Sequence, residues 1–277
     1  MAKLGFNQAT TLKNSTLVKD LVLAEKYGYD YIEIRLDKLK EFLRDHTVDE
    51  LAAFFAGSRL KPYSFNALEF ITFRDKAGYA AIKEDLGFLC KVGQRIGCRE
   101  IVVVPTFDVG DKTLAEIRRE SHRALGDLAD EAAKYGVRLA YEFVGYPNCS
   151  VNTFGQCYEI VASLDRADIG LVLDCFHFHA MNSRLDDLRQ ADAAKLFILH
   201  IDDSEDLPPG WLRDHHRLWP GDGVAPLADI LGTLKRKGFD NMISVELFRP
   251  EYWGWDTEAA FRVGKEKTEA VLAAYFR

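Results

Sequence analysis

Four apolar runs in the second half of the chain each end in a residue that can bind a metal ion or move a proton. The runs are Leu139-Ala140-Tyr141-Glu142, Leu171-Val172-Leu173-Asp174, Phe197-Ile198-Leu199-His200 and Ile243-Ser244-Val245-Glu246. Three carboxylates and an imidazole, with no thiolate, suit Mn²⁺, Mg²⁺, Co²⁺ or Zn²⁺. A single carboxylate at the end of a strand is usually just a solvated residue. Four polar ends at one depth need a cation, because the carboxylates would otherwise repel each other and take up protons.

Side chains alternate between the two faces of a strand, so one register aims all four groups to the same side. Neighbouring strands lie about 4.8 Å apart, and inward groups on four neighbours can therefore converge on one ion. We expect one divalent ion held by Glu142, Asp174, His200 and Glu246.

Two residues near this set are candidates for contact with substrate. His177 lies three residues after Asp174, where it could contact substrate or orient the metal ligands, whereas His179 is expected to be a packed histidine. Arg217 opens the segment Arg217-Leu218-Trp219-Pro220-Gly221-Asp222-Gly223, which reads either as a simple turn or as a turn whose arginine forks onto a hydroxyl or carboxylate.

Three further residues end strands in the first half of the chain. Glu33 and Arg35 end the second predicted strand, and Asn66 ends the third. Each is expected either to complete the far wall of a substrate pocket or to take part in internal polar pairing. The sequence alone leaves both readings open.

The elements that must position these residues repeat eight times. Apolar, β-branched or aromatic runs lie at residues 4–7, 31–34, 62–66, 101–105, 138–142, 170–174, 196–201 and 242–246. Segments with helical periodicity follow them at residues 17–27, 48–56, 79–96, 114–135, 153–164, 185–190, 227–237 and 257–275. Glycine follows several of these helices, where a left-handed cap is expected.

Eight strand–helix units in a chain close to the usual length predict an α/β fold of the (β/α)₈ TIM-barrel class. An open Rossmann-like sheet would need a glycine-rich turn after its first strand, and that turn here reads Asn7-Gln8-Ala9-Thr10-Thr11. No linker-like or low-complexity stretch interrupts the chain, so we expect residues 1–277 to form one domain. Barrel enzymes carry their chemistry at the carboxyl ends of the strands, where the four polar residues fall.

Composition narrows the functional classes. The chain has 277 residues, 48% of them hydrophobic, and a formal net charge of −7. That charge disfavours nucleic acid as a partner. The longest apolar run is far shorter than the roughly 18 to 20 residues of a membrane span, and the start lacks a signal peptide's apolar core, so we expect a cytoplasmic protein with no membrane partner. Five cysteines without a Cys-x-x-Cys pair are expected to be reduced.

The Glu, Asp, His, Glu series, with Asp174-x-x-His177, resembles the xylose-isomerase-like barrel family, which contains sugar isomerases, epimerases and the related endonuclease IV. Longer shared stretches lie at residues 6–11, 29–35, 142–145, 151–154, 170–181, 200–203, 219–221 and 244–252. The resemblance implies a divalent metal on the four polar residues. It also implies a cyclic polyol ketone of inositol catabolism as the small-molecule substrate.

Isomerisation of such a ketone moves a proton between neighbouring carbons through an enediolate, which a metal ion stabilises as a Lewis acid. Glu142 and Glu246, on opposite sides of the set, are then expected to act as base and acid. The alternatives are a ketose 3-epimerase or another sugar isomerase, a 3-dehydroshikimate dehydratase, endonuclease-type DNA repair, which the charge disfavours, and a binding barrel without catalysis. The sequence leaves the native metal and any homo-oligomer open.

Overall fold

Eight parallel strands close into a barrel in the computed structural model, which describes residues 3–276. The barrel strands are β1 (Lys3–Asn7), β2 (Tyr31–Arg35), β3 (Lys61–Leu68), β4 (Glu100–Val103), β5 (Arg138–Glu142), β6 (Ile169–Asp174), β7 (Leu196–Ile201) and β10 (Met242–Val245). They follow one another around the barrel in chain order, and β10 closes it by pairing with β1. The predicted (β/α)₈ barrel is confirmed.

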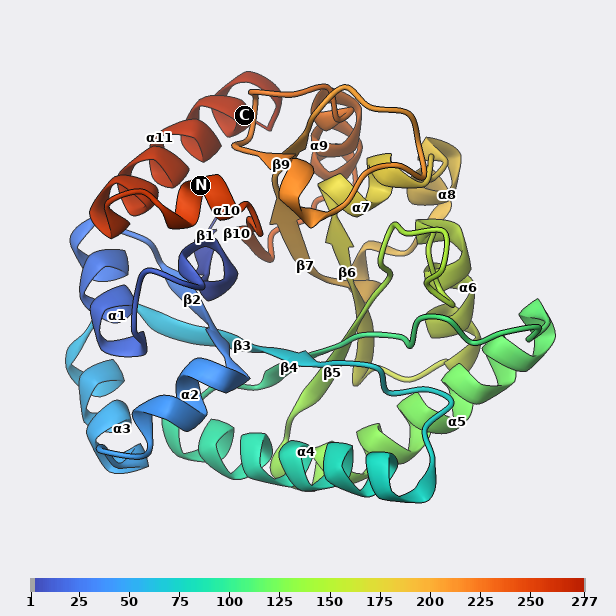
Figure 1. The fold of residues 1–277 in the computed structure, drawn as a ribbon, viewed down its shortest axis with the longest axis horizontal. Helices are drawn as coiled ribbons and strands as arrows, with labels where there is room; N and C mark the ends of the chain where they lie inside the picture. Colours follow the sequence, from blue (N-terminus) through green and yellow to red (C-terminus); the bar gives the residue numbers. More distant parts are fainter. Residues whose placement is uncertain (1–2, 277) are drawn as a thin grey trace.

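Helices surround this barrel on its outside (Figure 1). The helices that the sequence predicted are α1 (Leu17–Lys26), α3 (Val48–Gly57), α4 (Lys76–Ile96), α5 (Leu114–Ala132), α6 (Phe154–Leu164), α8 (Leu185–Gln190), α9 (Leu227–Arg236) and α11 (Thr257–Tyr275). Local chemistry sets several of their ends. Thr47 and Thr113 each form a capping box with the glutamate three residues later, which satisfies free backbone N–H groups at the helix start. Gly97 and Gly136 adopt positive φ angles of 82° and 68° after a helix, as predicted.

Helix α4 begins three residues earlier than the periodicity indicated, because Asp75 caps it by accepting a hydrogen bond from the Gly78 N–H. The sequence reading also missed several short elements. These are α2 (Leu36–Phe42), α7 (Cys175–Ala180), α10 (Pro250–Trp253), the 3₁₀ turns η1 (Gln8–Thr11), η3 (Ala193–Lys195) and η4 (Asp214–His216), and the small antiparallel pair β8 (Asp203–Ser204) and β9 (Arg217–Leu218). They are too short to leave a periodic signal. A further 3₁₀ turn, η2 (Ala133–Tyr135), continues α5 within the predicted helix at 114–135.

The strands bury both of their faces, as parallel barrel strands must. One core fills the space between strands and helices, and a second, smaller core fills the barrel interior. Ala140, Val172 and Ile198 belong to the inner core. Each stands two residues before one of the predicted ligands, so strand alternation points Glu142, Asp174 and His200 inward above that core.

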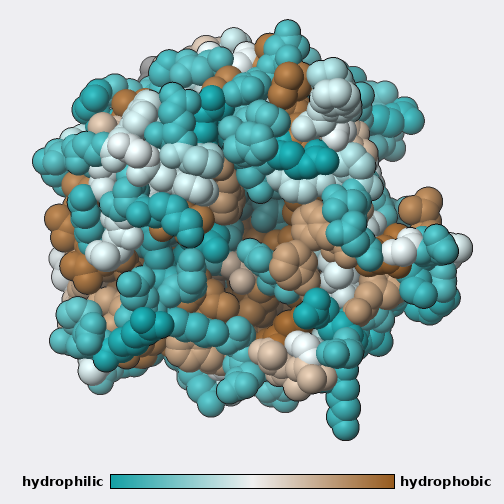
Figure 2. Space-filling model, in the orientation of Figure 1, coloured by the Kyte–Doolittle hydropathy of each residue, from teal (hydrophilic) through white to brown (hydrophobic). Residues whose placement is uncertain are grey.

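The surface of the molecule is hollowed near the centre of the ring of helices (Figure 2), with hydrophobic side chains around the hollow and hydrophilic ones on the rim. Among residues 3–276, none of the helices has the length and apolar character to cross a membrane. All five cysteines are buried and carry free thiols, in line with the predicted reduced state.

Candidate metal centre and active site

The four predicted ligands come together at the carboxyl end of the barrel. Glu142, Asp174, His200 and Glu246 are all buried, and one candidate ligand atom from each lies within 4.8 Å of the other three. The Nδ1 atom of His200 lies 3.0 Å from Glu142 Oε1, 3.1 Å from Glu246 Oε2 and 3.9 Å from Asp174 Oδ2. One edge of the imidazole therefore faces three carboxylates.

These residues converge although they are staggered along their strands. Asp174 pairs with His200 across β6 and β7, whereas Glu142 pairs with Val172, two residues before Asp174. His200 pairs with Ser244, so Glu246 lies two positions farther along and just beyond the end of β10. Barrel strands tilt by about 36° to the axis, which brings staggered residues to similar depths. The four residues thus converge, as expected, because the strands tilt. They do not occupy equal positions in the pairing register.

The electrostatics of this set favour a cation. Burial, together with Glu246 and Asp174, raises the pKa of Glu142 to about 7, although His200 opposes the shift. Burial alone would lower the pKa of His200, but Glu246, Glu33 and Glu142 raise it well above its ordinary value. Without a metal ion, bound protons offset the repulsion among these buried carboxylates. A divalent cation would offset that repulsion in their place.

The donor set also fits such an ion by geometry. Donors bound at about 2.1 Å from one ion lie at most about 4.2 Å apart, and the observed spread of 4.8 Å is only slightly larger. Small side-chain adjustments would suffice. Three oxygen donors and one nitrogen donor suit Zn²⁺, Mn²⁺, Co²⁺ or Mg²⁺, as predicted.

Glu33 supports His200 from the far side of the ring. His200 Nε2 lies 3.1 Å from Glu33 Oε1, and Ser64 Oγ donates to Glu33 Oε2 at 2.6 Å. His200 outweighs the effect of burial and lowers the pKa of Glu33, so Glu33 is a charged acceptor. A metal ion would displace the proton from Nδ1. The remaining ring hydrogen would then lie on Nε2, toward Glu33, and the lone pair of Nδ1 would face the ion.

Arg217 is 1% exposed and lies among acids. Its Nη1 donates to Asp174 Oδ2 at 2.6 Å and to Asp202, and its Nε donates to Asp214 at 3.0 Å. The sequence reading left a choice between a plain turn and an arginine that forks onto a hydroxyl or carboxylate. The structure places carboxylates around the guanidinium. Arg217 thus holds Asp174, a predicted ligand, from outside the set.

His177 lies next to Arg217, in α7 directly after Asp174. Its Nε2 is 2.9 Å from Arg217 Nη2, and its backbone N–H donates to Asp174 Oδ1 at 2.6 Å. Because the guanidinium can only donate, Nε2 accepts and the ring hydrogen lies on Nδ1. That Nδ1 is buried without a hydrogen-bond partner among the described residues. Burial and Arg217 lower the pKa of His177 to about 3, so the ring stays neutral.

The two remaining predicted residues, Asn66 and Arg35, make different kinds of contact. Asn66 lies in the site, where its Nδ2 donates to Glu246 Oε1 at 3.2 Å. Arg35 does not pair with Glu33. Its Nε donates to Asp37 at 3.0 Å, and its guanidinium carbon lies 5.8 Å from the centre of the Phe248 ring.

Two polar residues of the site were missed, Asn7 and Asp202. Asn7 ends β1 and donates to Glu246 Oε1 at 2.7 Å, and Asp202 follows β7 and accepts hydrogen bonds from Arg217 and from the Phe176 N–H. Both stand at or just past the end of an apolar run, so the rule that found the four ligands could have found them as well.

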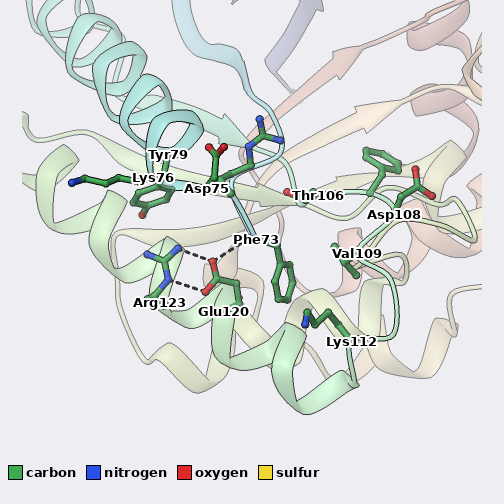
Figure 3. A pocket seen from close by; sticks show the side chains of 12 residues that line it. Phe73, Asp75, Lys76, Tyr79, Thr106, Asp108, Val109, Lys112, Glu120 and Arg123 are labelled. Carbon is green, nitrogen blue, oxygen red and sulfur yellow. Dashed lines mark hydrogen bonds and ion pairs between the residues drawn. The ribbon is translucent and has the colours of Figure 1, made fainter.

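A separate groove opens beside the barrel mouth, between the loops that follow β3 and β4 (Figure 3). Its volume is about 650 Å³, and none of the four predicted ligands lines it. Glu120 accepts hydrogen bonds from Arg123 and from the Phe73 N–H across its floor. Glu120 and Arg123 are thus paired with each other.

Comparison with known proteins agrees with this geometry. The family model for the xylose isomerase-like TIM barrel matches residues 21–270. Inosose isomerase of Halalkalibacterium halodurans is 50% identical over 99% of this chain and 98% of its own length. Inosose isomerase of Bacillus subtilis is 48% identical over 99% of both chains. A crystal structure of the IOLI protein with a bound zinc atom superposes with a TM-score of 0.97, at 48% identity over 99% of both chains.

Curated proteins with two of the alternative functions match only part of this chain in sequence. A ketose 3-epimerase of Arthrobacter globiformis is 25% identical over 62% of this chain and 56% of its own length. A 3-dehydroshikimate dehydratase of Pseudomonas aeruginosa is 30% identical over 49% of this chain and 22% of its own length. In sequence, the inosose isomerases therefore resemble this chain over far more of its length.

Proposed function

This chain belongs to the xylose isomerase-like TIM-barrel family, and from that membership we propose that it converts 2-keto-myo-inositol to 1-keto-D-chiro-inositol with one divalent metal ion. Its full-length similarity to inosose isomerases shows that it is an isomerase. The observation that carries the proposal is the buried set in which Glu142 and Glu246 flank Nδ1 of His200. Glu142, Asp174, His200 through Nδ1, and Glu246 would hold the metal ion.

The reaction moves a carbonyl group to the neighbouring carbon. A proton leaves the carbon that bears the hydroxyl group, and a proton is returned to the former carbonyl carbon, while the hydroxyl hydrogen passes from one oxygen to the other. No electrons leave the substrate, so the chemistry needs no redox cofactor. A bound divalent cation would supply a Lewis acid that stabilises negative charge on the two substrate oxygens.

The chain's own residues supply the proton transfers. Carboxylates are proton acceptors and donors of suitable strength when burial shifts their pKa values toward neutrality. Glu142 and Glu246 lie on two sides of His200, and we assign them the roles of base and acid. Their spacing lets one substrate lie within reach of both.

Two neighbours would bind the substrate. The unpartnered Nδ1–H of His177 would donate to a substrate oxygen, because a buried donor without a partner is costly unless a ligand satisfies it. Asn66 would lie at the edge of the bound ring, and Arg217 would act mainly by holding Asp174 and His177.

A substrate panel tests this proposal. The chain reconstituted with Zn²⁺, Mn²⁺, Co²⁺ or Mg²⁺ is incubated with 2-keto-myo-inositol, ketohexoses or 3-dehydroshikimate, and the products are identified by NMR. We expect turnover of 2-keto-myo-inositol to the neighbouring ketone. Epimerisation of a ketohexose at higher kcat/KM, or loss of water from 3-dehydroshikimate, would instead assign one of the alternatives.

A further inference from the structure

Asn7 connects two carboxylates of the site that belong to different strands. It ends β1 and is completely buried. Its Nδ2 donates to Glu246 Oε1 at 2.7 Å and to Glu33 Oε1 at 3.2 Å, while its Oδ1 accepts from the Ala9 N–H at 2.9 Å. Both amide hydrogens and the amide oxygen are thus engaged, and the side chain has one defined orientation.

The two carboxylate oxygens of Glu246 have different partners. Oε1 accepts from Asn7 and from Asn66, whose Nδ2 lies 3.2 Å away. Oε2 is the oxygen that faces His200 Nδ1, at 3.1 Å. Two amide donors on one oxygen oppose rotation of the carboxylate, because rotation would leave buried N–H groups without an acceptor.

Glu142 is held in another way. Its Oε1 lies 3.0 Å from His200 Nδ1, and its second oxygen has no hydrogen-bond partner within residues 3–276. Of the two glutamates that flank His200, only Glu246 is fixed by side-chain amides from neighbouring strands. The fixed orientation of Glu246 is therefore particular to that residue and is not shared by Glu142.

We propose that Asn7 is a positioning residue that, together with Asn66, turns Oε2 of Glu246 toward the metal ligands and keeps Oε1 away from them. Glu246 then enters the ligand set through one oxygen. Asn7 also donates to both Glu246 and Glu33. One amide group therefore aligns Glu246, the predicted ligand beside Nδ1 of His200, and Glu33, which faces Nε2 of the same ring. Groups that support ligands in this way typically change metal affinity by about 10–100-fold when removed. The inference rests on the proposed metal-dependent function.

The experiment measures binding of Zn²⁺ and Co²⁺ alone to the full chain, without substrate. Asn7→Leu keeps a similar shape and charge but removes both donors, and Asn66→Ala removes the second, longer contact. We expect the dissociation constant for Zn²⁺ to rise about 10–100-fold in Asn7→Leu and less in Asn66→Ala. We also expect the visible absorption of the Co²⁺-loaded variant to change in intensity, because a freed carboxylate can bind through both oxygens.

Asn241→Leu is the matched control. Asn241 donates to the Leu196 carbonyl at 2.8 Å, at the start of β7 and far from the ligands. Its loss should lower thermal stability and leave Zn²⁺ affinity and the Co²⁺ spectrum unchanged. Wild-type affinity and spectrum in folded Asn7→Leu and Asn66→Ala would overturn the proposal. If Asn7→Leu does not fold, Asn66→Ala decides alone. Failure of the wild-type chain to isomerise 2-keto-myo-inositol would overturn the proposed function and leave these metal measurements as a separate result.

Discussion

His200 Nε2 lies 3.1 Å from Oε1 of Glu33, so this carboxylate fixes which ring nitrogen of His200 can face the ligand set. The opposite nitrogen, Nδ1, lies beside Glu142 and Glu246. A carboxylate behind a histidine ligand fixes the tautomer and raises the basicity of the coordinating nitrogen. Glu33, which comes from a strand on the other side of the barrel, would thereby support the proposed metal centre without belonging to the ligand set.

Replacing Glu33 should weaken metal binding. Glu33→Gln keeps the size of the side chain but removes the charge behind His200, so we expect the affinity for Zn²⁺ to fall about 10–100-fold. Competition with a chromophoric chelator measures this. Glu100→Gln is a control, since Glu100 is a buried carboxylate that pairs with Arg138 at the start of β4. Its replacement should lower stability and leave metal affinity unchanged.

Loss of Arg217 should affect more than substrate affinity. The sequence alone suggested that Arg217→Ala would chiefly raise KM, through lost contact with substrate. In the structure Arg217 pairs with Asp174 and Asp202, which are both fully buried. Removing one partner of a buried ion pair costs about 3–5 kcal/mol. We therefore expect Arg217→Ala to lower the free energy of unfolding by that amount and to weaken metal binding.

Urea unfolding and metal titration of the Arg217 variants measure these effects. Arg213→Ala is the control, because Arg213 is exposed and lies over the Tyr146 ring in the same loop. Its replacement should change the free energy of unfolding by less than about 1 kcal/mol. Unchanged stability and metal affinity in Arg217→Ala, with only KM raised, would restore the simpler substrate-contact role.

The stability of metal-free protein should fall as pH rises through neutrality. The pKa of Glu142 is raised from 4.5 to about 7, so the folded chain holds a proton that the unfolded chain has released. Stabilisation from this proton is complete below about pH 4.5 and is lost as pH rises through about 7. Because the raised pKa of His200 acts in the same direction, the decline should continue above neutrality.

Calorimetric unfolding between pH 6.5 and pH 8 measures this decline, above the range in which the lowered pKa of His177 has the opposite effect. Glu142→Gln is the variant in which the decline should be shallower. Zn²⁺ binding should release protons, since ligands must be deprotonated. Titrations in two buffers of different ionisation enthalpy would detect that release. A free energy of unfolding that rises with pH in the metal-free protein would contradict the predicted sign.

Much of the barrel, and the convergence of the four proposed ligands, could be predicted from local pattern. Short apolar runs lead into Glu142, Asp174 and His200, and the two-residue alternation points them inward. The environment of Arg217 could not be predicted in this way. It depends on how β8 and β9 pair, which brings Arg217 back over Asp174 across 43 residues of sequence. The tautomer of His200 likewise depends on Glu33, 167 residues away in sequence.

Glu142 and Glu246 should each be needed for the chemical step. Glu246→Gln and Glu142→Gln remove a proton acceptor, and loss of a positioned acid or base costs about 10²–10⁴ in rate. We expect kcat to fall by at least this range in both variants. Metal content must be measured alongside, because each residue is also a predicted ligand. Near wild-type kcat in metal-replete Glu246→Gln would remove that residue from the proton transfer.

The central claim is a metal-dependent proton transfer on a cyclic polyol ketone, and one NMR experiment in D₂O tests it most directly. The metal-loaded chain is incubated with 2-keto-myo-inositol without any nicotinamide cofactor, and the product ring is identified together with its deuterium content. The account predicts 1-keto-D-chiro-inositol with deuterium at the carbon that has gained a hydrogen, and loss of turnover when a chelator removes the metal. Turnover that requires an added nicotinamide, or that persists in the metal-free chain, would contradict it.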